Sequence, residues 1–120
     1  MLSQRRRLLI VDDQRPARKG LQALLAFSPE LEWVGEAANG QEAVNLVAER
    51  RPNVVLMDIR MPVMDGLEAT RRIKSQRPEV RVIVLTMYAE YQAEALAAGA
   101  DAFLVKGGPS EALRDAICKA

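Results

Sequence analysis

The 120-residue sequence contains no histidine and a single cysteine, and both facts exclude some chemistry. Without histidine, the chain has no imidazole general base, no histidine-ligated metal and no phosphohistidine. A single cysteine, Cys118, cannot form an internal disulfide, so nothing in the sequence indicates an oxidising compartment. We expect Cys118 to be a small buried hydrophobic residue.

The sequence also lacks an excess of charge and any long hydrophobic run. A formal net charge of +1 gives no electrostatic reason for this chain to bind nucleic acid directly. No apolar run approaches the roughly 20 residues that cross a membrane. The apolar stretch that begins at Leu8 is interrupted at Asp12, which is too short for a signal peptide. We therefore expect a cytoplasmic protein without membrane contact.

Hydrophobic residues make up 49% of the chain, enough for one folded core. Four continuous apolar runs occupy residues 8–11, 54–57, 82–85 and 102–105. Continuous runs of this length favour strands that are buried on both faces of a parallel sheet. The less apolar segment 31–37 predicts a fifth strand nearer the edge of the sheet.

Signals for helices lie between these runs. Pro16 suits the first turn of a helix, and Asn39 and Asp65 each precede a helical pattern with a glutamate three residues later. A short alanine-rich helix is predicted over residues 91–98, and Pro109 is predicted at the first position of the last helix. Strand and helix then alternate five times, which predicts a doubly wound α/β fold with helices on both faces.

Each of the four apolar runs ends on a reactive side chain. Asp12 and Asp13 follow the first run, and Asp58, Thr86 and Lys106 follow the others. Parallel strands share one carboxyl edge, where open α/β sheets place their sites. Two carboxylates ~4 Å apart repel by about 4 kcal/mol at an effective dielectric of 20, so three favour a hard cation such as Mg²⁺. With an ammonium and a hydroxyl nearby, we expect a site for a tetrahedral anionic group that faces a carboxylate.

On these residues, the sequence resembles the receiver domain of two-component response regulators over essentially all of residues 1–120. The resemblance is carried by residues 10–13, 57–62, 64–66, 85–86 and 99–106. It implies a single receiver domain with a flavodoxin-like, five-stranded parallel sheet in the order 2-1-3-4-5. Many receivers have a proline directly after the lysine, whereas Gly107 and Gly108 follow it here, so we expect a more mobile loop. This loop and residues 85–88 are most similar to the subfamily with a LuxR-type helix-turn-helix output domain.

The resemblance implies roles for the acidic residues. Asp58 is the phosphoacceptor. Asp13 and Asp58 bind Mg²⁺ directly, together with the backbone carbonyl of Arg60, and Asp12 acts largely through water.

It also implies roles for three residues of the later strands. Lys106 pairs with one phosphoryl oxygen, and Thr86 hydrogen-bonds another once the phosphoryl group is attached. Phe103 occupies the position of a switch aromatic residue, which rotates into the space that Thr86 leaves.

The implied function is a phosphorylation-dependent signalling switch, with only weak self-phosphorylation from small donors and self-dephosphorylation as activities. The donor is a sensor histidine kinase or a phosphotransfer protein, because this chain has no histidine of its own. The expected output is control of transcription through a DNA-binding domain outside this chain, with a homodimer formed on phosphorylation. The chain is then the N-terminal part of a longer regulator, or a stand-alone receiver that acts through protein partners.

Three other functions fit the sequence less well. A flavodoxin-like cofactor binder needs a phosphate-cradling loop after the first strand, where this chain has Asp12 and Asp13. A Mg²⁺-dependent phosphohydrolase places a second aspartate two residues after its nucleophile, but Arg60 stands there and cannot act as a general acid. A degenerate receiver lacks one of the acids or the lysine, and all are present here.

Two finer expectations concern the surroundings of the site. Long side chains at Arg60 and Tyr88, each two residues beyond a site residue, are expected to shield an acyl phosphate from water. Pro16, Arg18 and Leu21, on the first predicted helix, are expected to form part of a docking face for the kinase.

Overall fold

The strands form one parallel sheet in the order β2-β1-β3-β4-β5. The computed structural model describes residues 5–119. Its strands are β1 (Arg6–Val11), β2 (Leu31–Ala37), β3 (Val54–Met57), β4 (Arg81–Thr86) and β5 (Ala102–Val105). The predicted strand order is confirmed, and the less apolar segment 31–37 is an edge strand as expected.

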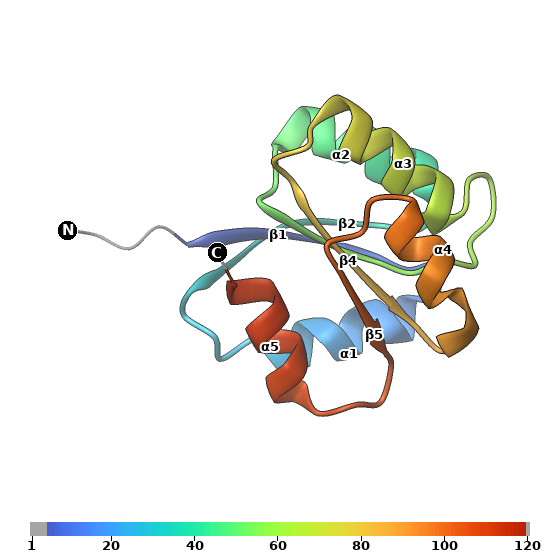
Figure 1. Ribbon diagram of the computed structural model, residues 1–120. Coiled ribbons are helices and arrows are strands. Elements are labelled where there is room, and N and C mark those ends of the chain that lie inside the picture. The colour runs from blue at the N-terminus through green and yellow to red at the C-terminus, as the bar shows by residue number, and fades with distance from the viewer. Residues whose placement is uncertain (1–4, 120) are drawn as a thin grey trace.

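Helices cover both faces of this sheet (Figure 1). They are α1 (Arg15–Leu25), α2 (Gly40–Arg50), α3 (Gly66–Gln76), α4 (Gln92–Ala97) and α5 (Ser110–Cys118). Figure 1 shows α1 and α5 on one face and α2 and α3 on the other, and α4 lies beside β5. Among residues 5–119, no helix combines the length and the apolar character that crossing a membrane requires.

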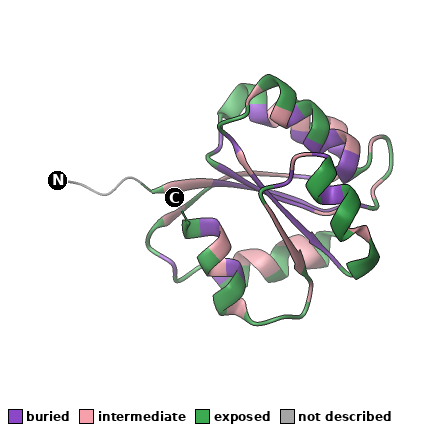
Figure 2. Ribbon diagram, viewed as in Figure 1, coloured by how far each residue is buried: buried purple, intermediate pink, exposed green. Residues whose placement is uncertain are grey.

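Alternate residues of each central strand pack into different cores. Leu9 and Val11 belong to the core beneath α2 and α3, whereas Leu8 and Ile10 belong to the core beneath α1 and α5. All four are buried, as Figure 2 shows for most of the central strands. The continuous apolar runs are thus explained for β1, β3 and β4. The expectation of burial on both faces is wrong for β5, where Val105 is 41% exposed because this strand lies at the edge of the sheet.

Two helices begin at the predicted capping residues. The Asn39 side chain accepts a hydrogen bond from the Glu42 N–H at 2.9 Å, and the Asp65 side chain accepts one from the Glu68 N–H at 2.9 Å. The Glu42 carboxylate in turn accepts the Ala38 N–H at 2.9 Å. These contacts satisfy backbone donors that a helix start otherwise leaves unpaired.

Three local predictions need correction. Pro109 is the N-cap of α5, so the helix proper begins one residue later. Tyr91 ends a short 3₁₀ turn (Ala89–Tyr91) before α4 begins at Gln92. Cys118 is exposed, because it ends α5 on the side away from the core that Ile117 fills.

Candidate functional site

Three carboxylates meet at the carboxyl edge of the sheet. Asp12 and Asp13 follow β1, and Asp58 follows β3, whose last residue pairs with the last residue of β1. This register brings the acids together, and one oxygen of each lies within 4.8 Å of the others. Asp12 is only 1% exposed, and 13% of the Asp58 side chain reaches solvent.

Lys106 enters this acidic cluster from the end of β5. Its ammonium lies 2.6 Å from Asp12 Oδ2 and 3.2 Å from Asp58 Oδ2. Its backbone N–H donates to the Thr86 carbonyl at 2.8 Å, and Gly107 follows with a φ of 89°, a conformation that suits glycine. The lysine is therefore held by three contacts, although no proline directly follows it.

Backbone groups fix two of the three carboxylates. Asp12 Oδ1 accepts the Gln14 N–H at 2.9 Å, and Asp58 Oδ1 accepts the Ile59 N–H at 2.8 Å. Among residues 5–119, Asp13 receives only a long contact of 3.4 Å from the side-chain amide of Gln14. Each fixed carboxylate therefore directs its second oxygen at Lys106, and Asp13 is the least constrained of the three.

Burial and mutual charge set the proton affinities in this site. Burial raises the pKa of Asp58 above its ordinary value, and the Asp12 charge adds to this effect, although the Ile59 N–H and Lys106 oppose it. Burial would lower the pKa of Lys106, but its hydrogen bond to Asp12 and the charges of Asp58 and Asp12 raise it overall. The lysine thus stays charged, while Asp58 is a more basic carboxylate than a solvated aspartate.

The three carboxylates suit a hard divalent cation. They offer oxygen ligands only, which Mg²⁺ prefers, and they carry three negative charges against the single positive charge of Lys106. A bound cation would offset the remaining repulsion. The donor set therefore fits the predicted magnesium ion.

Thr86 and Phe103 lie on β4 and β5, the two strands that follow β3 in the sheet. Thr86 is the buried last residue of β4, and its hydroxyl accepts the Tyr88 N–H at 3.3 Å. In the described part of the chain, no hydrogen bond joins this hydroxyl to the three acids. Phe103 is half-buried in β5 and packs against a small core that includes Ile59 and Val84.

The side chain of Arg60 turns toward two tyrosines. Its guanidinium lies 4.0 Å from the centre of the Tyr88 ring, and its Nε donates to the Tyr91 hydroxyl at 3.3 Å. Two predictions concern Arg60: its backbone carbonyl as a Mg²⁺ ligand, and its long side chain, with that of Tyr88, as a shield of an acyl phosphate. The side chain is exposed and lies against Tyr88. The loops after β3 and β4 are joined by this contact.

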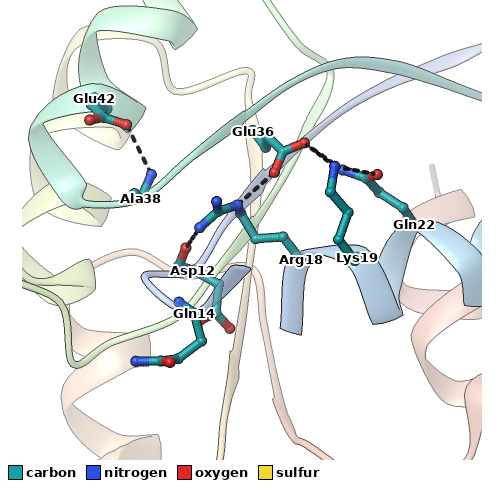
Figure 3. Close-up of polar contacts among 8 residues, drawn as sticks. All are labelled: Asp12, Gln14, Arg18, Lys19, Gln22, Glu36, Ala38 and Glu42. Carbon is teal, nitrogen blue, oxygen red and sulfur yellow. Dashed lines mark hydrogen bonds and ion pairs between the residues drawn. The ribbon is translucent and has the colours of Figure 1, made fainter. Parts of the chain in front are cut away.

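Two features of the site were not predicted. A Cβ added at Gly66 would lie 1.8 Å from the Asp58 carbonyl oxygen, so the loop after β3 closes on itself only with glycine there. Arg18 of α1 donates from Nη1 to the Asp12 carbonyl at 2.7 Å and from Nε to Glu36 at 2.6 Å (Figure 3). The Asp-Gly pair signals the first feature, whereas no local pattern signals the second.

Comparisons with known proteins give a consistent family. The model of the response regulator receiver domain matches residues 8–118. The transcriptional regulatory protein LnrK of Bacillus subtilis is 42% identical over 113 residues, which cover 92% of this chain and 51% of LnrK.

Two solved structures resemble this one closely. A LuxR-family DNA-binding response regulator from Staphylococcus aureus has a TM-score of 0.85 and 32% identity, over 92% of this chain and 94% of that one. The CheX-CheY-BeF3-Mg+2 complex from Borrelia burgdorferi contains a chain with a TM-score of 0.83 and 28% identity, over 92% of this chain and 85% of that one. The chain spans about half the length of the curated relatives that it matches.

Proposed function

The chain belongs to the response regulator receiver family, and from this premise we propose that Asp58 is the residue that accepts the phosphoryl group. Receivers of this family are signalling proteins of two-component systems. The observation that supports Asp58 is the convergence of three carboxylates and one ammonium at a single sheet edge. Asp58 directly follows a central strand, and burial raises its pKa above the ordinary value.

The proposed reaction is transfer from a phosphohistidine on another protein. A carboxylate oxygen of Asp58 attacks phosphorus in line, a P–O bond forms, and the P–N bond to the donor imidazole breaks. Lys106, already 3.2 Å from this carboxylate, pairs with an oxygen of the incoming group. The raised basicity of the buried carboxylate favours attack. Later, water attacks phosphorus, the P–O bond to Asp58 breaks, and the carboxylate and inorganic phosphate are released.

We propose Mg²⁺ as the cofactor, held by Asp13, Asp58 and the Arg60 carbonyl, with Asp12 acting through water. When bound, the ion supplies charge neutralisation for the oxygens of the phosphoryl group. The relative from Borrelia burgdorferi was solved in a complex that contains Mg²⁺ and BeF3, which supports this choice. Asp12 keeps its hydrogen bonds to Lys106 and the Gln14 N–H, which suits a less direct role.

The proposed output is a population shift in the segment after β4. The Thr86 hydroxyl now accepts a hydrogen bond from the Tyr88 N–H, and an attached phosphoryl group offers a strong acceptor to which the same hydroxyl can donate. Movement of Thr86 leaves space that Phe103, only half-buried now, can occupy. The exposed apolar side chains nearby, Met87 and Leu96, belong to the face that this movement alters, and we propose this face for homodimer or output contacts.

The kinase or phosphotransfer partner is proposed to dock beside Lys106. A mostly apolar cleft of about 460 Å³ lies between α1 and the start of α5, and its lining includes Leu21, Leu24 and Lys106. Leu21 therefore fits the predicted docking face. Arg18 does not, because its side chain is only 14% exposed and its Nε and Nη1 donate to Glu36 and to the Asp12 carbonyl.

We further propose that residues 1–120 are a single receiver domain at the N-terminal part of a longer transcription regulator, because the curated relatives are named transcriptional regulatory proteins and are about twice as long. Transcription takes place in the bacterial cytoplasm, which is the proposed location. We propose no catalytic activity beyond weak self-phosphorylation and loss of the phosphoryl group. A stand-alone receiver that acts on protein partners is the second candidate.

The test is incubation of the chain with Mg²⁺ and acetyl phosphate, followed by intact mass measurement. The wild type is expected to gain one phosphoryl group, and the Asp58→Asn variant none. Asp65→Asn is the matched control, since it makes the same change at an exposed helix cap that asparagine also serves well. Equal phosphorylation of both variants would refute the assignment of Asp58.

A further inference from the structure

A network of side chains leads from the edge strand β2 to the backbone of the acidic cluster. Glu36 on β2 accepts hydrogen bonds from Arg18 Nε at 2.6 Å, from the Gln22 side chain at 2.7 Å and from Lys19 at 3.3 Å. Arg18 also donates to the Asp12 carbonyl at 2.7 Å. Figure 3 shows the Arg18 guanidinium between the two acceptors, with Lys19 and Gln22 on the far side of Glu36.

The Asp12 carbonyl belongs to the peptide that joins Asp12 to Asp13. Because a peptide is planar, fixing its oxygen fixes the direction in which the chain enters Asp13. On the other side of Asp12, its N–H donates to the Ala37 carbonyl at 3.0 Å. Both backbone groups of Asp12 are therefore held: the N–H by Ala37 of β2, and the carbonyl by Arg18, which Glu36 of β2 binds in turn.

Asp13 depends on this arrangement more than the other acids do. Within the described part of the chain, its carboxylate has only the long contact to Gln14, whereas the Asp12 and Asp58 carboxylates each accept hydrogen bonds from a backbone N–H and from Lys106. The position of the Asp13 carboxylate is therefore set mainly by the backbone, that is, by the orientation of the Asp12–Asp13 peptide.

We propose that Arg18, oriented by Glu36, is a positioning residue that sets the Asp12–Asp13 peptide and thereby prepares Asp13 to bind Mg²⁺. The guanidinium suits this task, because its planar fork presents Nη1 and Nε to two acceptors in fixed directions. Outer residues that orient metal ligands typically change metal affinity by about 10- to 100-fold when they are removed. This inference rests on the proposed magnesium site.

The sign of the effect separates positioning from simple electrostatics. Arg18 carries a positive charge close to a proposed cation site, so its charge alone weakens Mg²⁺ binding. Replacing it with an uncharged residue would then strengthen binding. Positioning predicts the opposite, a loss of affinity of about tenfold in Arg18→Met.

Lys19→Met is the matched control. Lys19 lies on the same helix, carries the same charge and contacts the same carboxylate of Glu36, but it makes no hydrogen bond to Asp12. We expect its Mg²⁺ affinity to equal or slightly exceed that of the wild type. Arg18→Lys is the charge-matched variant, because an ammonium cannot reproduce the fork that joins the Asp12 carbonyl to Glu36, and several-fold weaker binding is expected.

The experiment is calorimetric titration with Mg²⁺ at a temperature where urea unfolding shows each variant to be fully folded. A metal-free readout accompanies it: the ¹⁵N shift of the Asp13 amide, which belongs to the clamped peptide, is expected to move in both Arg18 variants and to stay in Lys19→Met. If Arg18→Met does not fold, Arg18→Lys carries the same test.

If the wild type binds Mg²⁺ and the Arg18 variants bind it equally well or more tightly, the inference is overturned and the proposed function still stands. Absence of Mg²⁺ binding in the wild type would overturn both.

Discussion

Replacing Glu36 with glutamine tests the electrostatics of the network that ties α1 to β2. Hydrogen bonds from Arg18 and then Gln22, with the nearby charge of Lys19, lower the pKa of Glu36 from 4.5 to about 2, against a smaller opposing effect of burial. At about 1.4 kcal/mol per pH unit, this corresponds to at most about 3.5 kcal/mol of folding free energy. The side chain is 31% exposed, and screening by water reduces the expected contribution to about 1–2 kcal/mol.

The pH dependence follows from the direction of the pKa change. A carboxylate whose pKa is lowered by folding stabilises the protein fully above its ordinary value of 4.5, and this contribution disappears as the pH falls toward about 2. At pH 7 we therefore expect the free energy of unfolding of Glu36→Gln to be about 1–2 kcal/mol lower than that of the wild type. By about pH 3, less than half of this difference should remain.

Urea unfolding followed by circular dichroism, repeated between pH 7 and pH 3, measures the difference. Glu32→Gln is the matched control, because Glu32 is an exposed residue of the same strand, and its change is expected to stay within about 0.5 kcal/mol. A Glu36→Gln difference that stays constant across this pH range would refute the reasoning.

Three further predictions concern the loops and caps around the site. Gly66→Ala should destabilise the protein by about 1–3 kcal/mol and slow phosphorylation, because the new methyl group would meet the Asp58 carbonyl; urea unfolding and acetyl phosphate kinetics measure both effects. Asn39→Ala should cost about 1 kcal/mol in urea unfolding without changing phosphorylation, since only a helix cap is lost. Arg60→Ala combined with Tyr88→Ala should shorten the lifetime of the acyl phosphate several-fold, because the stacked side chains of these residues then no longer exclude water. Intact mass measurements after removal of the donor give this lifetime, and an unchanged lifetime would contradict shielding.

Much of the fold could be predicted because the central strands are buried on both faces. Burial on both faces demands continuous apolar residues, as in β3, and such runs are visible without an alignment. The same reasoning failed for Val105, since an edge strand needs apolar residues on one face only. Cys118 shows a similar limit, because the rotation of a short terminal helix decides which side chains reach solvent.

The convergence of the site residues was predictable for a different reason. Parallel strands deliver the residues after their carboxyl ends to one edge, so Asp58 and Lys106 meet although 48 positions separate them. The contact of Arg18 with Glu36 was not predictable, because it depends on the rotation of α1 and on a register shift between β1 and β2. The stacking of Arg60 on Tyr88 depends in the same way on loop conformations that no local pattern encodes.

The most direct test of the central claim is to locate the phosphoryl group after reaction with acetyl phosphate and Mg²⁺. Borohydride reduces an aspartyl phosphate to homoserine, which tandem mass spectrometry of peptides identifies by position. We predict homoserine at position 58 only, and none when Mg²⁺ is removed by a chelator. Homoserine at Asp12 or Asp13, or equal labelling without Mg²⁺, would contradict a magnesium-dependent phosphoacceptor at Asp58.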